Sequence, residues 1–217
     1  METTQAELYR RYDDYAVEIM KVIRDEFTPL RLAGFDELTV TNTIRRTKLI
    51  YERIDKRNRK AYREMCDWVY EWVYVQYGKN PPDKDWTKVV DAWLKGYDPV
   101  TQYVYVNELE RKMHRLNEGI LSCREETNHA GLEDVIRTAS NYLLTQSLQT
   151  GLDLMGEMQK RAFADAEDEE AKVQYHACDD DSTCGECHAD DGKIFRLSEA
   201  PRLPRHYRCR CWYTRAR

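Results

Sequence analysis

Proline and glycine are scarce in this chain, and this scarcity constrains its fold more than any other feature. The 217 residues include only six prolines and nine glycines, so few sharp turns are available. Charged residues make up 34 % of the chain and hydrophobic residues 41 %, which excludes collagen, low-complexity linkers and most disordered classes. A chain of this length can bury a core of its own without disulfide staples. The composition therefore favours a folded, mainly helical protein.

Apolar residues recur with the 3.6-residue period of an amphipathic helix over most of the chain. This period predicts helices over residues 4–27, 41–77, 83–94, 103–120 and 132–158. Thr28-Pro29 is expected to end the first helix, and Thr41-Asn42 to cap the second. The segment Trp68–Val75 has the aromatic and β-branched content of a strand, but its flanks are helical and its tryptophans share one helical stripe, so a helix is favoured. No heptad pattern persists long enough to predict a coiled coil.

The pattern changes after about residue 170. Residues 172–177, 193–197 and 209–213 alternate between apolar and polar like short strands and are joined by turn-rich loops. The predicted fold class is mainly α, with a helical N-terminal body and a small C-terminal α+β module of short strands around a Cys/His cluster.

Charge is also divided along the chain, although the net charge is only −5. Residues 163–192 contain eleven acidic residues and one lysine, whereas residues 193–217 contain seven arginines, one lysine and one glutamate. The two stretches either neutralise each other within one small fold or bind a partner. Phosphate contacts, if made, are expected from a set of C-terminal arginines, and would give weak, sequence-independent and salt-dependent DNA binding. That set is Arg202, Arg205, Arg208, Arg210, Arg215 and Arg217.

Five of the seven cysteines lie in the last 40 residues, where they form a pattern typical of a metal site. Cys184 and Cys187 have the spacing of a metal knuckle, and His206 and Cys209 repeat it. Cys209 and Cys211 would point to one face of an extended strand. Thiolates with one imidazole suit tetrahedral Zn²⁺, and a fully ligated site is structural. Either His206 or Cys211 can supply the fourth ligand, and the alternative without metal is a core of reduced cysteines.

Other motif interpretations fail on chemistry or context. Cys184–His188 spells the haem-attachment pattern C-x-x-C-H, but the N-terminus lacks the basic start and apolar run of an export signal. The zinc-deaminase pattern needs a glutamate that His176–Cys178 does not supply, and Thr183 replaces its proline. Asp179–Asp181 is most simply a solvated turn. The chain contains no P-loop, G-x-G-x-x-G, H-E-x-x-H or G-x-S-x-G motif, so no catalytic or cofactor-binding residue is predicted.

Four of these segments, in this order, resemble the phage Mu F-like family of minor head, or head-morphogenesis, proteins. They are Asp179-Asp180-Asp181, Thr183-Cys184-Gly185-Glu186-Cys187, Asp191-Gly192-Lys193-Ile194-Phe195 and His206-Tyr207-Arg208-Cys209-Arg210-Cys211. Upstream, Ile136-Arg137-Thr138 is similar to the family's R-T-E helix, with Ala139 in place of the acidic residue. Tyr207-Arg208 stands where the family has P-N. The resemblance covers about residues 105–213.

The resemblance implies two regions: residues 1–104, helical and of unassigned role, and residues 105–217, the Mu F-like region. The latter comprises long helices (105–165) and the Cys/His-rich module (170–217). It also implies a structural phage or prophage protein without enzymatic activity. Such a protein would associate with the portal and other head proteins, act in head assembly, contact packaged DNA weakly, and reside in the virion after assembly in the host cytoplasm.

The alternative to a structural head protein is an enzyme. It would be a metal-dependent nuclease or toxin-like enzyme on a zinc-knuckle scaffold, with His188, His206 and Asp190 or Asp191 as acid/base groups. Fifteen tyrosines and five tryptophans are many for this length and favour an interface with a protein partner. No apolar run approaches the roughly 20 residues of a membrane-spanning helix.

Overall fold

The computed structural model describes residues 5–96, 108–168, 170–178 and 183–216, and these form two compact units. Unit 1 consists of Met1–Tyr15, Tyr62–Trp86 and Leu148–Arg217, and unit 2 of Ala16–Ala61 and Thr87–Ser147. The helices are α1 (Gln5–Arg31), α2 (Val40–Val75), α3 (Trp86–Gly96), α5 (Leu109–Glu125), α6 (His129–Ala166) and α7 (Gly185–Asp190). The expected boundary at residue 104 lies outside the described residues and stays a prediction.

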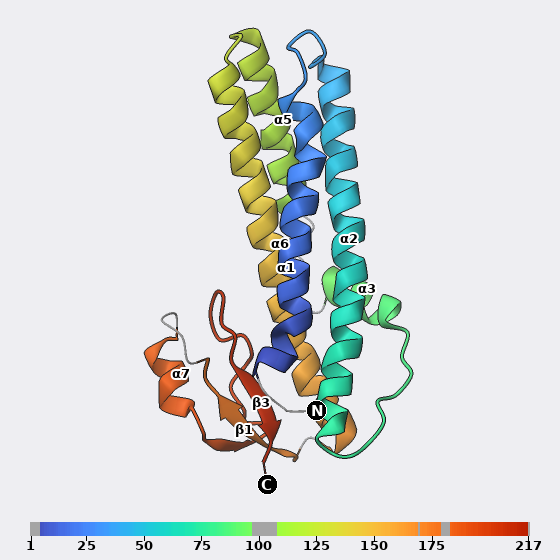
Figure 1. Cartoon of the computed structure of the whole chain (residues 1–217), viewed down its shortest axis with the longest axis vertical. Coiled ribbons are helices and arrows are strands. Elements are labelled where there is room, and N and C mark those ends of the chain that lie inside the picture. Colours follow the sequence, from blue (N-terminus) through green and yellow to red (C-terminus); the bar gives the residue numbers. More distant parts are fainter. Residues whose placement is uncertain (1–4, 97–107, 169, 179–182, 217) are drawn as a thin grey trace. The chain divides into compact units, whose positions relative to one another are not determined.

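Unit 2 is a bundle in which parts of α1, α2, α5 and α6 run side by side (Figure 1). Its core is built from aliphatic side chains at the helical spacing that the sequence shows. The fully or nearly fully buried members include Ile19, Ile23, Ile50, Ile54, Leu116, Ile120, Leu132 and Ile136. Burial of this kind contributes about 25 cal/mol per Å² of apolar surface and holds the bundle together.

Two buried polar contacts fix the register of the unit 2 helices. Thr47 on α2 donates a hydrogen bond of 2.6 Å to the Asn117 carbonyl oxygen on α5. Asn58 on α2 donates one of 2.8 Å to the Ser147 hydroxyl on α6. Each pair satisfies groups that would otherwise be buried at a cost of about 1–3 kcal/mol.

The predicted helices are present, and their ends differ from the predictions. α1 continues past Thr28-Pro29 to Arg31, because a proline in the last turn removes one hydrogen bond only. α2 begins at Val40, where the Thr39 hydroxyl accepts a 3.4 Å hydrogen bond from the Asn42 amide. The helix predicted over residues 103–120 appears as α5, and its first expected turns lie outside the described residues. The ambiguous segment Trp68–Val75 is helical, as predicted.

Unit 1 combines the ends of α1, α2 and α6 with α7 and a three-stranded antiparallel sheet of order β2-β1-β3. The strands are β1 (Lys172–His176), β2 (Ile194–Arg196) and β3 (Trp212–Arg215). β1 is central: Val173 pairs with Phe195 on one side and Arg215 on the other. The predicted mainly α fold with a small C-terminal α+β module is confirmed.

Glutamine side chains from the helices close the outer edge of β3. The Tyr213 amide donates a 3.1 Å hydrogen bond to Gln159 on α6, and the Arg215 amide donates one of 2.8 Å to Gln76 on α2. Tyr9 on α1 adds a 3.0 Å hydrogen bond to the Cys211 carbonyl. These contacts satisfy strand groups that would otherwise remain open to another chain.

The loop before β3 packs closely against α6 at Gly156. A Cβ atom built at Gly156 would lie 2.1 Å from the carbonyl oxygen of Leu203. Only glycine permits this approach of loop backbone to helix. Together with the glutamines, this contact makes the sheet and the helix ends of unit 1 one packed body.

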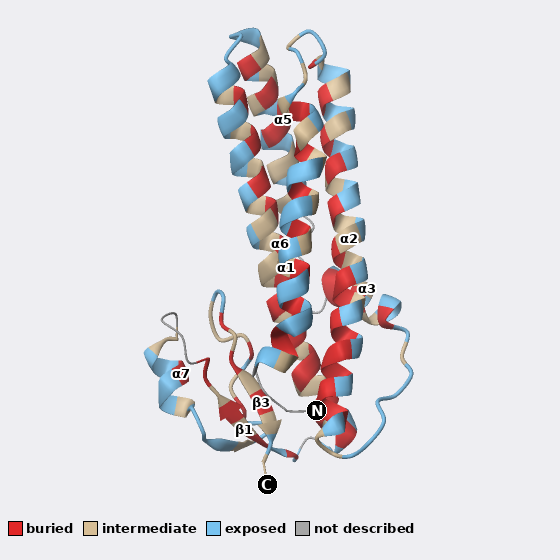
Figure 2. Cartoon of the chain, viewed as in Figure 1, coloured by how far each residue is buried: buried red, intermediate tan, exposed pale blue. Residues whose placement is uncertain are grey.

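Most of the aromatic residues that the structure describes belong to the core. Tyr62, Tyr70, Trp72, Tyr175 and Tyr213 are among the largest fully buried side chains. Among the described residues, Tyr207 is the only aromatic side chain among the large exposed hydrophobic ones, at 53 %. Figure 2 shows buried positions along the inner faces of the helices. The described aromatic residues add no exposed surface beyond Tyr207, and the interface expected from the aromatic content stays a prediction.

None of the helices in the described part of the chain is both long and apolar enough to cross a membrane.

Candidate metal centre

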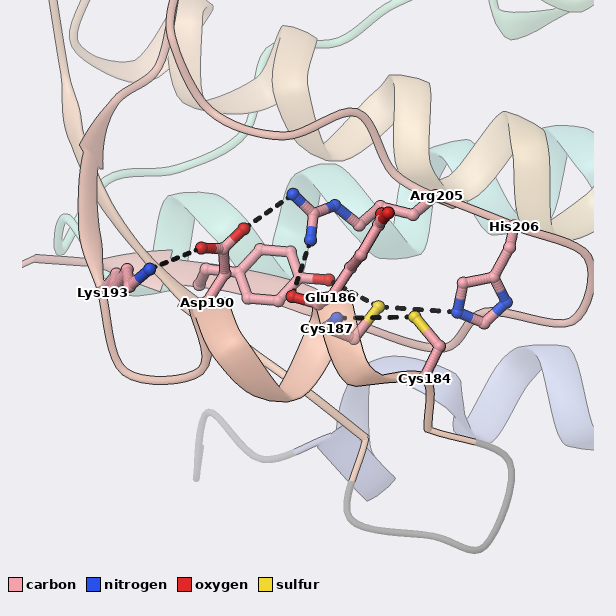
Figure 3. A network of polar contacts seen from close by, with 8 residues as sticks. Cys184, Glu186, Cys187, Asp190, Lys193, Arg205 and His206 are labelled. Carbon is pink, nitrogen blue, oxygen red and sulfur yellow. Dashed lines mark hydrogen bonds and ion pairs between the residues drawn. The ribbon is translucent and has the colours of Figure 1, made fainter.

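The candidate metal centre begins at the N-terminus of α7. Cys184 is the N-cap residue, and its extended backbone directs its sulfur back toward the first turn, where it accepts a 3.5 Å hydrogen bond from the Cys187 amide. The i, i+3 spacing predicted a tight turn, and the structure forms that turn as the start of a six-residue helix. Both sulfurs therefore lie on one side of the backbone (Figure 3).

The loop before β3 brings the second half of the cluster to Cys187. His206 Nε2 lies 3.5 Å from Cys187 Sγ. The ligand atoms of Cys184, Cys187 and His206 all lie within 4.8 Å of one another, and so do those of Cys187, Cys209 and Cys211. Cys187 belongs to both groups. The structure thus brings together all five residues that the sequence predicted as metal ligands.

The centre is mostly closed to solvent. Cys187, Cys209 and Cys211 are 0 %, 3 % and 2 % exposed. Tyr175 on β1 donates a 3.2 Å hydrogen bond to Cys187 Sγ from within the sheet. All seven cysteines of the chain are free thiols, so the cluster is not cross-linked by a disulfide.

Hydrogen bonds among the thiols give the cysteines of the cluster different pKa values. The Cys211 thiol donates to Cys209, which lowers the pKa of Cys209 to about 5 and raises the pKa of Cys211 well above its ordinary value. The backbone amide of Cys187 lowers the pKa of Cys184. Burial raises the pKa of Cys187. The hydrogen bond to the Tyr207 carbonyl raises the pKa of His206. The arrangement favours thiolate at Cys209 and Cys184, and thiolate is the form that binds metal.

A network of ions around Arg205 joins the two halves of the centre. Arg205 donates to the Glu186 carbonyl at 2.9 Å and to Asp190 at 2.6 Å, both on α7. Lys193 forms a second ion pair with Asp190, at 2.9 Å (Figure 3). The pKa of Asp190 is lowered by these partners, Lys193 first. Arg205 directly precedes His206, so this network holds one ligand loop against the helix that carries the other.

The residues expected to act in a nuclease have structural partners or face solvent. Asp190 is ion-paired, and the Asp191 carboxylate accepts a 2.8 Å hydrogen bond from the Ala177 amide. His188 is exposed on α7. Asp179–Asp181, predicted to form a solvated turn, lies outside the described residues.

The arginines expected to contact DNA also have partners within the protein. Arg205 is bound to α7, and Arg210 pairs with Asp13 at 3.0 Å and lies over the Tyr9 ring. Arg208 and Arg215 lie over the rings of Tyr207 and Tyr77. Arg202 also takes part in an interaction, and Arg217 lies outside the described residues.

Sequence reasoning missed the groups that attach the metal module to the helices. Gln149 accepts a 3.0 Å hydrogen bond from the Arg208 amide, as Gln159 and Gln76 do from β3. Gln159 is fully buried, and it stands between apolar positions on α6. A polar residue at a buried helical position was the available signal, because such a residue requires a hydrogen-bond partner.

The fold and the centre define a class: a helical protein with a C-terminal module organised around clustered cysteines and a histidine. Residues 123–214 match the family of phage Mu protein F-like proteins. The match includes the whole cluster and confirms the resemblance seen in the motifs. It begins in α5, somewhat later than the expected start at residue 105. Comparisons with curated proteins and with solved structures give no match. The matched region spans 92 of the chain's 217 residues.

The donor set fits a metal ion. Sulfur and imidazole ligands from the N-cap of α7 and from the loop before β3 form two overlapping groups of three that share Cys187, and together they offer more ligand atoms than the four of a tetrahedral site. The Cys/His groups can therefore hold a metal.

Proposed function

We propose that this protein is a structural minor head protein of a phage or prophage, which associates with the portal and acts in head assembly. The observation that carries the proposal is the family match over residues 123–214. Assembly would take place in the host cytoplasm, and the product would reside in the virion. Co-expression with the portal protein encoded in the same genome should give a complex that purifies together at low and moderate salt. Clean separation of the two proteins under both conditions would refute portal association.

The metal of the C-terminal module is proposed to be one structural Zn²⁺, held by Cys184, Cys187, His206 and Cys209. The lowered pKa values of Cys184 and Cys209 support their role as thiolate ligands. Cys211 is the less suitable fourth ligand, because its thiol is the hydrogen-bond donor to Cys209. When bound, zinc would cross-link α7 to the loop before β3 and add folding free energy to unit 1.

Elemental analysis of protein purified under reducing conditions, without chelator, tests the zinc proposal. We expect about one zinc per chain. Cys187→Ala should abolish zinc binding, whereas Cys66→Ala, which removes another buried free thiol on α2, should leave it intact. His206→Ala should weaken binding more than Cys211→Ala does. Well under half a zinc per chain in the wild-type protein would refute the metal assignment.

The protein is further proposed to act without catalysis. The engagement of Asp190 and Asp191 within the module supports this, since Asp190 pairs with Arg205 and Asp191 accepts a hydrogen bond from the Ala177 amide. A plasmid-cleavage assay with Mg²⁺ and with Mn²⁺ is the test. Cleavage that disappears in Asp190→Asn but persists in the control Asp134→Asn would support the nuclease alternative.

A further inference from the structure

Positive charge is concentrated in the first half of α2, far along the chain from the arginine-rich C-terminus. Residues 45–60 contain eight Lys/Arg and two acidic residues, in a chain whose net charge is −5. All sixteen residues belong to unit 2 and to one continuous helix. The apolar period of this segment is that of an ordinary amphipathic helix, so its pattern alone does not single it out.

Four of these cations form a stripe on the solvent side of the helix. Arg45, Arg53, Lys56 and Lys60 are all exposed, and at about 100° per residue they lie within an arc of roughly 80°. We call these four residues the basic stripe. Their side chains lie roughly opposite the face that packs into unit 2, which consists of Thr43, Thr47, Ile50, Ile54, Asn58 and Ala61. At 1.5 Å per residue the stripe extends for about 22 Å.

Neighbouring carboxylates neutralise the flanks of the helix more than they neutralise the stripe. The flanking cations pair with Glu37, Glu52, Glu18, Asp55 and Asp91. Within the stripe, Arg45 and Lys56 form no ion pair with any residue that the structure describes, whereas Lys60 takes part in an interaction within the protein. Arg53 pairs with Glu26 at 3.1 Å, but its side chain is 63 % exposed, and a pair of this kind contributes only about 0–1 kcal/mol. A polyanion can therefore compete for the stripe.

We infer that the basic stripe binds the phosphate backbone of duplex DNA. About 22 Å of duplex carries roughly a dozen phosphates, so four cations on a straight helix can each meet one. Two of the four are lysines, which are depleted at protein–protein interfaces, and no residue of the described part of α2 adds an exposed aromatic side chain to them. Since no base-reading element is required, the contact would be sequence-independent. This inference rests on the proposed function, because packaged DNA is the partner of a head protein. It assigns the DNA contact to α2 instead of the C-terminal arginines.

Fluorescence anisotropy with a mixed-sequence duplex of about 25 base pairs, over 25–200 mM salt, tests the inference on the full chain. Four phosphate contacts predict a slope of log K against log salt near −4. The triple variant Arg45→Gln, Lys56→Gln, Lys60→Gln should reduce the slope to about −1 and weaken binding at low salt by about tenfold or more. The matched control Lys21→Gln, Lys88→Gln, Lys95→Gln removes the same charge from exposed positions of unit 2 and should leave the slope unchanged. Circular dichroism of both variants verifies that the helices are intact.

Three results would overturn the inference: no binding at 25 mM salt, an equal loss in the stripe and control variants, or tighter binding of polyglutamate than of DNA at equal charge concentration. The last would indicate an acidic protein surface as the partner. A further outcome concerns the C-terminal arginines. If the triple variant Arg202→Gln, Arg208→Gln, Arg215→Gln loses DNA binding while the basic-stripe variant keeps it, the DNA contact belongs to the C-terminal arginines and the inference is also overturned. Portal association and zinc binding are measured in separate experiments. A negative result there would refute the proposed function without changing the outcome of the DNA-binding assay.

Discussion

The contact between Gly156 and Leu203 makes a sharp prediction about what attaches the metal module to α6. Gly156→Ala places a methyl group 2.1 Å from the Leu203 carbonyl oxygen and 2.4 Å from its carbon. Ordinary non-bonded contacts are roughly 3.5 Å or longer, so the loop must move by about 1 Å or more. The atoms that must move are backbone, which cannot rotate away as a side-chain end can.

Two opposing effects decide how much Gly156→Ala changes the free energy of unfolding. Alanine stabilises a helix interior by about 1 kcal/mol relative to glycine. Overpacking of a close contact costs about 1–3 kcal/mol and somewhat more where backbone must shift. The net expectation is a loss of about 1–2 kcal/mol, which lowers the melting temperature of a chain of this size by roughly 2–8 °C.

Gly151→Ala is the matched control, because it lies in the same helix and in the same unit. Its added methyl would lie 3.5 Å from a Tyr12 ring carbon and 3.6 Å from the Met65 sulfur, which is ordinary contact. This variant should therefore gain about 0.5–1 kcal/mol. Urea unfolding of both variants, with trypsin cleavage after the C-terminal arginines as a local probe, measures the difference. If Gly156→Ala proves as stable and as protease-resistant as Gly151→Ala, the packing argument is wrong.

Three further predictions address buried or ionised groups. Gln159→Leu should destabilise the protein by about 1–3 kcal/mol in urea unfolding because it leaves the Tyr213 amide without its acceptor, and Gln76→Leu, at a more exposed site, should cost less. Ser147→Ala should cost about 1–2 kcal/mol by removing the acceptor of the buried Asn58 amide, whereas Ser122→Ala, at an exposed hydroxyl, should be nearly neutral. Burial alone would raise the pKa of Asp165, but the hydrogen bonds from Lys84 and Tyr70 outweigh it and lower that pKa. Asp165→Asn should therefore cost about 0.5–1 kcal/mol at pH 7, after discounting for solvent screening, and the difference from wild type should vanish as the pH falls below the carboxyl's folded value; a cost that persists at pH 2 would contradict this reasoning.

Local signals were sufficient for the five helices predicted from apolar periodicity and for identifying cysteines and a histidine that lie close together, whereas α7 was predicted only as a turn. The runs of apolar residues at helical spacing in α2 and α6 are long. An error of a few residues at either end therefore leaves the prediction of the helix unchanged. Pro29 predicts the end of a helix because its ring restricts the residue before it, yet the last turn of α1 accommodates this proline. Cys184, Cys187 and His206 were found because ligand chemistry requires these residue types at short spacing.

Long-range contacts could not be predicted, because a sequence states a side chain's chemistry without naming its partner. Gln159 and Gln76 meet β3 across separations of 54 and 139 residues. The predicted helical body and C-terminal module also gave no hint that α1, α2 and α6 each contribute to two compact units. The C-terminal arginines looked free in the sequence because Asp13, the partner of Arg210, is 197 residues away.

The hydrogen bond from Tyr9 to Cys211 has a consequence for the order of folding during synthesis. It joins residues 202 positions apart, and unit 1 needs segments from both ends of the chain. Unit 2 needs nothing after Ser147. On a ribosome that adds about 5–20 residues per second, the segments of unit 2 emerge several seconds before β3 does. The Tyr9 hydroxyl must wait through that interval without its partner Cys211, so nascent chains stalled before residue 211 should be the species that a chaperone retains.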